Sequence, residues 1–160
     1  MSQAPEVTLR AATAADEQIL LAWANDPVTR AAGFQPEPIP AADHRRWLAD
    51  RLRSRSGRLL IGIAGDTPVG QVRLDRHADG RVEVGIAVAP EARGRGIGAT
   101  LLALALDEAR RDATLGPAAF IARIRPDNAA SIALFAGAGF RRIGTTEVRG
   151  FPCLVYEADA

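Results

Sequence analysis

Apolar residues recur with two different periods along the chain, and the period separates strands from helices. Alternating or continuous apolar runs bounded by turn residues predict strands at Val7 to Arg10, Arg58 to Ala64, Pro68 to Asp75, Arg81 to Val88, Ala118 to Ile124, Arg141 to Val148 and Phe151 to Glu157. Apolar residues at helical spacing predict helices at Ala14 to Ala24, from near Ala41, Thr100 to Arg111 and Ala129 to Ala138. The predicted order is therefore β-α-α-βββ-α-β-α-ββ.

This order indicates an α/β or α+β sandwich with a mixed sheet. Turns at Gly65-Asp66 and Ala78-Asp79-Gly80 join three strands into an antiparallel meander. At 160 residues, with no linker or repeat, the chain is predicted to form a single domain over residues 1–160, of which 1–6 form a loose terminus.

The predicted strand that ends at Val88 leads into a glycine-rich run and then a helix. The run reads Arg93-Gly94-Arg95-Gly96-Ile97-Gly98-Ala99. A helix N-terminus has free backbone N–H groups and a positive dipole end, and glycines let an anion approach the main chain. Two arginines add charged donors. The run therefore predicts a phosphate-binding loop.

Other interpretations of this run are open. Gly94, Gly96 and Ala99 also fit the G-x-G-x-x-A fingerprint of dinucleotide-binding folds. That fold places an acidic residue at the end of the next strand, whereas here the next strand ends in Arg125-Pro126. A phosphate-loop NTPase needs a lysine, and the chain has none. The run could also be a helix start that merely happens to be rich in glycine.

Composition excludes several classes of function. Basic and acidic residues number 20 and 19, so no basic face for nucleic acid is predicted. One cysteine, Cys153, permits no internal disulfide and fits a reducing compartment. Two histidines and one cysteine match no metal-ligand spacing. Without a leader-like or membrane-spanning apolar run, we expect a cytoplasmic protein without a metal or a membrane partner.

The pattern Arg-x-x-Gly-x-Gly, filled by Arg93, Gly96 and Gly98, resembles the pyrophosphate signature of the GNAT superfamily of acyl-CoA-dependent N-acetyltransferases. A second segment, from Asn128 to Phe140, resembles the GNAT helix that Asn and Ser open and Gly-Phe ends. The element order is similar from Val7 to Glu157. The resemblance implies a mostly antiparallel seven-stranded sheet flanked by helices, and acetyl-CoA as cosubstrate.

The resemblance also implies where the cosubstrate lies. The strands Val82–Val88 and Ala118–Ile124 would splay apart, with pantetheine in the gap against the main chain of Ile86, Ala87 and Val88. An N–H near Val88 would stabilise the oxyanion. The Arg93 to Ala99 run would bind the pyrophosphate. The remaining cosubstrate contacts would come from Asn128, Ser131 and Phe135.

Acetyl transfer needs a neutral amine and a proton for the leaving thiolate. Glu83 is the candidate base, by strand phase with Gly85 and by resemblance to some members of the family, although it could equally be a solvated glutamate. The family's usual acid is a tyrosine, and here that position is Phe135, which has no proton to give. Ser131 or water could replace it, or the thiolate could leave unprotonated.

The acceptor is predicted from the N-terminal half. Trp23, Asn25, His44 and Trp47 lie in segments that resemble acetyltransferases of amino-sugar nucleotides in nonulosonic-acid pathways. Aromatic faces suit sugar rings and bases, although both tryptophans could instead be core residues.

Two other functions and two assembly states are open. Similar N-terminal motifs occur in ribosomal-protein acetyltransferases, which acetylate protein N-termini. A non-catalytic acyl-CoA sensor is the third possibility, and Phe135 favours it. Assembly is open between a monomer and a homodimer.

Overall fold

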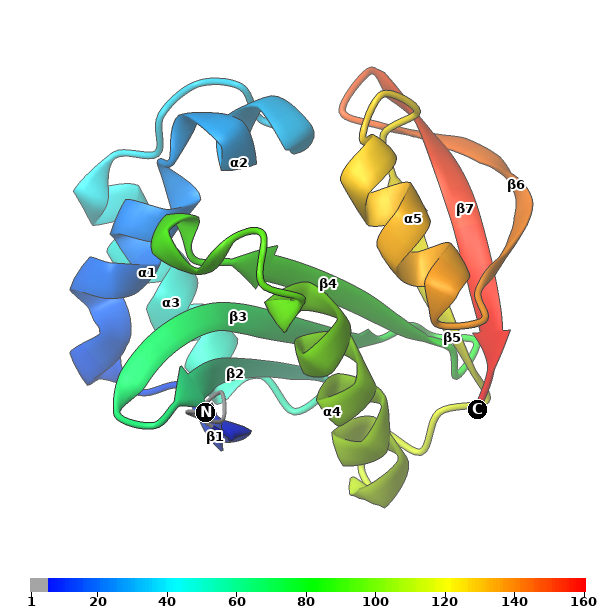
Figure 1. Cartoon of the computed structure of the whole chain (residues 1–160), viewed down its shortest axis with the longest axis horizontal. Coiled ribbons are helices and arrows are strands. Elements are labelled where there is room, and N and C mark those ends of the chain that lie inside the picture. The colour runs from blue at the N-terminus through cyan, green and yellow to red at the C-terminus, as the bar shows by residue number, and fades with distance from the viewer. Residues whose placement is uncertain (1–5) are drawn as a thin grey trace.

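The structure, a computed structural model, describes residues 6–160 as one sheet with helices on both faces (Figure 1). The strands are β1 (Val7–Ala11), β2 (Gly57–Ala64), β3 (Thr67–Arg76), β4 (Val82–Val88), β5 (Ala119–Ile124), β6 (Arg141–Val148) and β7 (Phe151–Asp159). The α-helices are α1 (Glu17–Ala24), α2 (Pro27–Ala32), α3 (Ala41–Arg53), α4 (Ile97–Arg111) and α5 (Ala129–Gly137). These elements confirm the predicted sheet-and-helix class. The proposed loose terminus at 1–6 lies outside the described residues, except for Glu6.

The seven strands form one sheet in the order β1-β2-β3-β4-β5-β7-β6. Every neighbouring pair is antiparallel except β4 and β5, which are parallel. The predicted meander of β2, β3 and β4 is thereby confirmed. The long connection from β4 to β5 carries α4 across one face, as a parallel crossover requires.

The first predicted helix is divided into two parts. Thr13 and Asp16 form a capping box around a 3-10 turn at Ala14–Asp16, and α1 begins only at Glu17. Asp26 then caps the short helix α2, which the predicted element order lacked, by accepting a hydrogen bond from the Thr29 amide at 3.1 Å. None of the helices within residues 6–160 is both long and apolar enough to cross a membrane.

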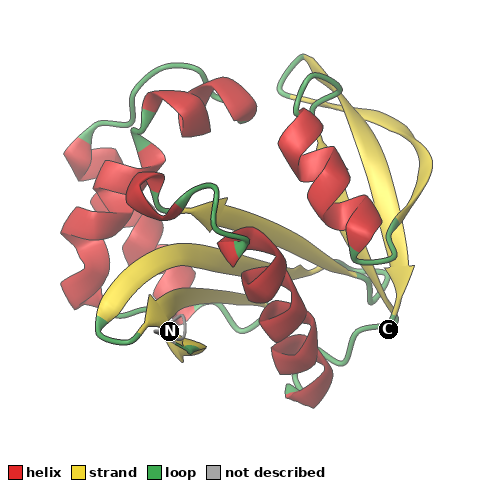
Figure 2. Ribbon diagram, viewed as in Figure 1, coloured by secondary structure: helices red, strands yellow, loops and turns green. Residues whose placement is uncertain are grey.

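Helices lie on both sides of the sheet (Figure 2), and two hydrophobic clusters occupy the sheet's opposite faces beneath them. Strand alternation sends Leu60 and Val72 to the face that α4 and α5 cover, and Leu59 and Ile61 to the face that α1 and α3 cover. Both faces of β2 and the α4-covered face of β3 are therefore buried, which makes this half of the sheet a firm support for β4.

β4 and β5 separate soon after they meet. The two strands pair only at Val82 with Phe120 and at Glu83 with Ile121. Beyond these positions β4 stays paired with β3 as far as Val88, while β5 follows β7. The sheet therefore divides into two halves, and Figure 1 shows them diverging toward α2 and α5.

Gly70 allows the close approach of β3 to β4 and α4. A Cβ atom there would lie 2.5 Å from the Ala87 carbonyl oxygen and 2.8 Å from Leu101 Cδ1. We predict that Gly70→Ala lowers the free energy of unfolding by about 1 to 3 kcal/mol, as overpacking does elsewhere. Urea denaturation measures this difference.

Gly144→Ala is the matched control, because a Cβ at Gly144 meets nothing within 4 Å. It should change stability by less than about 0.5 kcal/mol. Equal losses in the two variants would show that close packing at Gly70 is not a constraint.

Candidate active site

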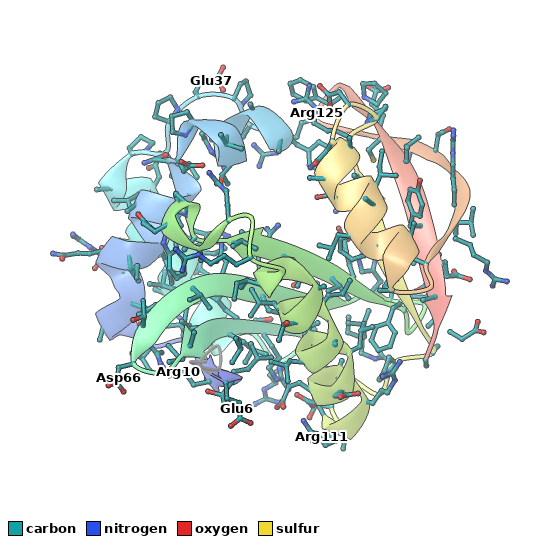
Figure 3. The ribbon with its side chains drawn as sticks, in the orientation of Figure 1. Glu6, Arg10, Glu37, Asp66, Arg111 and Arg125 are labelled. Atoms are coloured by element: carbon teal, nitrogen blue, oxygen red, sulfur yellow. The ribbon has the colours of Figure 1, made fainter. Side chains whose placement is uncertain are left out.

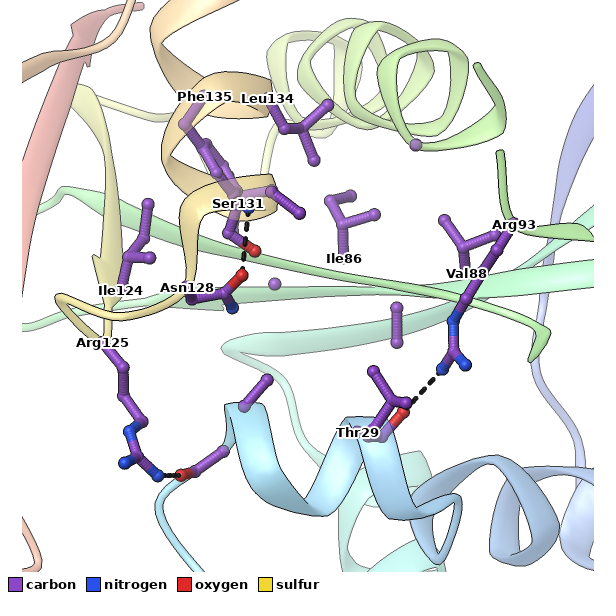
Figure 4. A pocket seen from close by; sticks show the side chains of 18 of the residues that line it. Thr29, Ile86, Val88, Arg93, Ile124, Arg125, Asn128, Ser131, Leu134 and Phe135 are labelled. Carbon is purple, nitrogen blue, oxygen red and sulfur yellow. Dashed lines mark hydrogen bonds between the residues drawn. The ribbon is translucent and has the colours of Figure 1, made fainter. Parts of the chain in front are cut away.

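A cavity of about 810 Å³ lies where β4 and β5 diverge (Figure 4). Its floor is the end of β4, and its sides are the start of α4, the start of α5 and the segment from Val28 to Gln35. This volume falls within the range of small-molecule sites. Of the thirteen residues predicted to bind the cofactor, twelve line this cavity and only Arg95 does not.

The unpaired edge of β4 presents backbone donors to the cavity. The Ala89 amide donates to the Val69 carbonyl across to β3 at 2.8 Å. Hydrogen-bonded positions alternate along an antiparallel pair, so the amides of Val88 and Ile86 face the opposite way, toward the gap. β5 does not pair with β4 at these positions. An extended ligand could therefore bond to β4 as an additional strand.

The glycine-rich loop brings a helix N-terminus to one end of the cavity. Gly94 and Gly96 have φ values of 78° and 74°, which residues other than glycine rarely adopt. Gly96 is the N-cap of α4, and it contributes no side-chain cap. The first amides of α4, at Ile97, Gly98 and Ala99, consequently lack intrahelical partners. This geometry suits an anion.

Arg93 braces the loop rather than standing free beside it. Its guanidinium donates to Asp26 Oδ2 at 2.6 Å and to Thr29 Oγ1 at 3.3 Å, which joins the loop to α2 (Figure 4). The hydrogen bond from Arg93 lowers the pKa of the Asp26 carboxyl. Arg95 is exposed and does not line the cavity.

The start of α5 forms the wall across from the loop. Asn128 Oδ1 accepts a hydrogen bond from the Ser131 amide at 3.1 Å, so Asn128 caps the helix as the sequence predicts. Phe135 is only 4% exposed and meets Phe140 edge-on at 5.0 Å between ring centroids. Asn128, Ser131 and Phe135 all line the cavity.

The segment after α2 forms a wall that the sequence did not reveal. Arg125, labelled near the start of α5 in Figure 3, donates to the carbonyls of Ala31 and Gly33, each at 3.0 Å, and so connects the end of β5 to this segment. Arg149, in the β6–β7 turn, donates to Gln35 at 3.1 Å. These bonds join residues about a hundred positions apart. The three prolines between Pro36 and Pro40 predicted extended backbone but not its direction.

Glu83 does not line the cavity. Its carboxylate lies 2.9 Å from His77 Nε2 and 2.9 Å from Arg123 Nε, and its side chain is 19% exposed. The position expected from strand phase is right, since Glu83 shares a face with Gly85, which does line the cavity. Its carboxylate is held by these two partners.

The structure does not bring the four predicted acceptor residues to the cavity. Trp23 and His44 are buried, Trp23 within the cluster beneath α1 and α3, and burial lowers the pKa of His44. Asn25 exchanges two hydrogen bonds with the Ile39 backbone, at 3.0 and 2.7 Å, and so fixes the loop before α3. Trp47 is 38% exposed and packs on His44, with 5.4 Å between the two ring centroids. Aromatic composition could not separate core from ligand contact.

One continuous cavity contains both the N-terminus of α4 and the unpaired edge of β4. A helix N-terminus suits a diphosphate, and the bare edge of β4 suits a chain of amides such as pantetheine. Within residues 6–160, no group of three His, Cys, Asp or Glu side chains is placed to share a metal ion.

Comparisons with known proteins agree with this geometry. Residues 6–141 match the acetyltransferase (GNAT) domain family. The N-alpha-acetyltransferase RimI of Mycobacterium tuberculosis is 38% identical over 68% of this chain and 65% of its own. A ribosomal-protein-alanine N-acetyltransferase from Brucella melitensis is 31% identical, with a TM-score of 0.80 over 96% of this chain and 99% of its own.

The fold extends to more distant proteins. The aminoglycoside acetyltransferase AAC(6')-Ib, solved with coenzyme A, has a TM-score of 0.83 at 20% identity over 96% of this chain and 95% of its own. The chain spans less than two thirds of the length of the curated relatives it matches. The family match covers most of the chain. It accords with two structural features, the separation of β4 from β5 and the glycine N-cap of α4. The chain belongs to the GNAT family of acetyltransferase domains.

Proposed function

We propose that this protein transfers the acetyl group of acetyl-CoA to a primary amine. The observation that carries the proposal is the continuity of the cavity from the α4 N-terminus to the unpaired edge of β4. The family match over residues 6–141 supports it. RimI and the Brucella protein are both named as N-acetyltransferases.

The chain's own groups would perform two tasks. The free amides of Ile97, Gly98 and Ala99 would bind the diphosphate, while Ile86 and Val88 donate to the pantetheine amides and the thioester carbonyl. As the amine attacks the thioester carbon, negative charge grows on the carbonyl oxygen, and the Val88 amide would stabilise it. The C–S bond then breaks, and the amine loses a proton.

Proton transfer is the step for which the cavity offers fewest groups. Phe135 has no proton to give, so we propose that Ser131 or water protonates the thiolate, or that the thiolate leaves as such. The pairing of Glu83 with His77 and Arg123 supports a positioning role for its carboxylate better than a role as base. Water is then the first acceptor of the amine proton.

For the acceptor, one proposal is an amino-sugar nucleotide, although the residues that suggested it, Trp23, Asn25, His44 and Trp47, do not line the cavity. A protein N-terminus is the second, and the identities to RimI and to the Brucella enzyme favour it. An aminoglycoside, which AAC(6')-Ib binds, carries several cationic amines, and the described residues that line the cavity include no carboxylate to receive them. We do not propose that acceptor.

Gly98→Asp tests the cosubstrate site. We predict that the new carboxylate weakens coenzyme A binding at least about tenfold, because it occupies the place of a phosphate. Thermal stability should hold, since an anion favours a helix N-terminus and a Cβ at Gly98 makes only ordinary contacts, at 3.5 Å or more. Calorimetry and thermal denaturation measure the two effects.

Thr145→Asp, an exposed site on β6, is the control and should bind coenzyme A normally. Thiol release from acetyl-CoA with a panel of amines then tests catalysis. Failure of the wild-type protein to bind coenzyme A would refute the proposal. Tight binding without release from any amine would favour the acyl-CoA sensor.

Phe135→Tyr tests the missing acid. We predict that kcat is kept or raised, because a phenol at this position could protonate the thiolate from the wall of the cavity. Steady-state kinetics with the best amine of the panel measures it. Loss of turnover with coenzyme A binding intact would give this position a different role.

Glu83→Gln tests the positioning role. We predict that kcat/KM of the variant still rises with pH as it does in the wild type, where the amine must lose its proton to react. The kcat should fall less than about tenfold, because the glutamine amide of the variant keeps hydrogen bonds to His77 and Arg123. Loss of a general base typically lowers kcat by about 100-fold or more. Glu157→Gln, which touches only the ion pair with Arg81, is the control. A flattened pH profile in Glu83→Gln alone would make Glu83 the base.

A further inference from the structure

Arginine dominates the charge of the cavity. Six arginines line it, and no aspartate or glutamate does among the residues the structure describes: Arg30, Arg73, Arg93, Arg123, Arg125 and Arg149. The whole chain carries a net charge of only +1. Three of the six pair with carboxylates just outside the lining, Arg93 with Asp26, Arg123 with Glu83 and Arg125 with Asp127. Among the described residues, the positive charge without an ion-pair partner therefore comes from Arg30, Arg73 and Arg149.

Four of these arginines hold the walls together. Arg93 bonds to Asp26, Arg125 to two carbonyls of the segment after α2, and Arg149 to Gln35. Arg30 donates to the Gln35 carbonyl at 2.7 Å. Contacts with protein groups account for Arg93, Arg125 and Arg149, while Arg30 keeps a buried Nε without a hydrogen-bond partner among the described residues.

Arg73 has no such explanation. Its backbone pairs within the sheet, but its guanidinium makes no hydrogen bond or ion pair with any residue from 6 to 160. The β3–β4 register pairs it with Gly85, and a Cβ on Gly85 would lie 3.0 Å from an Arg73 Nη and 3.4 Å from its Cζ. The bare glycine thus gives the guanidinium room to lie across β4 at the cavity.

The surroundings of Arg73 favour an anion. The residue is exposed to the open cavity, yet the strands crowd its guanidinium, and this loss of hydration is the main cause that lowers its pKa. Arg51 and Arg123 lower that pKa further, whereas the nearby carboxylates of Asp75 and Glu83 raise it. An arginine keeps its charge under these conditions, so it favours an anionic partner.

Arg123 extends this positive surface from the other half of the sheet. Its Nε donates to Glu83, which leaves the two terminal nitrogens of its guanidinium without a partner among residues 6–160. Both arginines lie on the sheet face opposite α4, on either side of β4. Gly85 is three residues from Val88, roughly 10 Å along the strand, so this pair stands apart from the α4 N-terminus.

We propose that Arg73 and Arg123 bind an anionic group, a phosphate or a carboxylate, on the molecule that carries the acceptor amine. This inference rests on the proposed acetyl transfer and narrows its acceptors to anionic amines. Guanidinium forks match both anions in geometry. Holding the anion beside β4 would place the amine of the same molecule next to the gap where the thioester lies.

The test uses matched amines that differ in one charge. The protein is first saturated with coenzyme A, so that the cosubstrate's phosphates occupy their own site. Glucosamine 6-phosphate against glucosamine tests a phosphate, and β-alanine against β-alaninamide tests a carboxylate. NMR titration at fixed ionic strength measures binding without any need for turnover.

We predict that at least one anionic amine binds about tenfold or more tightly than its neutral partner, and that Arg73→Gln removes this preference. Arg73→Glu should reverse it. Arg142→Gln removes the same charge at an exposed position on β6 and should leave the preference for the anionic amine intact. Coenzyme A affinity should be unchanged in all three variants.

Three results would overturn the proposal. Equal or undetectable binding of both members in both pairs would remove the anion site. A preference that Arg73→Gln and Arg73→Glu leave untouched would place the anion elsewhere. Weaker coenzyme A binding in Arg73→Gln would assign this arginine to the cosubstrate. Failure of the wild type to bind coenzyme A at the first step would instead refute the proposed function itself.

Discussion

The separation of β4 from β5 is the constraint on which the rest of the site depends. The strands share only two paired positions, so the backbone of β4 from Val84 onward faces a cavity on one side and β3 on the other. Unpaired amides away from water are costly unless something bonds to them. The fold keeps β4 in place through its pairing with β3 and the packing of β2 and β3 between two hydrophobic clusters, and an extended ligand can complete the sheet.

Long-range arginine contacts then shape the cavity around that gap. Arg93, Arg125 and Arg149 each bridge from the second half of the chain to α2 or the segment after it. These contacts turn a short helix and a proline-rich loop into a cavity wall. Arg73, whose guanidinium bonds to no residue between 6 and 160, faces the same space.

Much of this could be predicted from the sequence, because local chemistry determines it. Periodicity located all seven strands to within a few residues, and the glycines at 94 and 96 located the turn before α4. The residues expected to bind the cosubstrate lie in two local segments, 86–99 and 128–135, and all of them except Arg95 line the cavity. The wall formed by the segment after α2 could not be predicted, because it depends on tertiary contacts such as Arg125 to Gly33. Trp23 and Asn25 fit an acceptor site by residue type but serve the core and the loop before α3.

Amide hydrogen exchange of β4 tests the account most directly. The amides of Ile86 and Val88 point into the gap, whereas that of Ala89 already donates to Val69. With coenzyme A bound, exchange at Ile86 and Val88 should slow markedly while Ala89 changes little. Unchanged exchange at Ile86 and Val88 in the saturated protein would contradict the claim that the cosubstrate completes the sheet along β4.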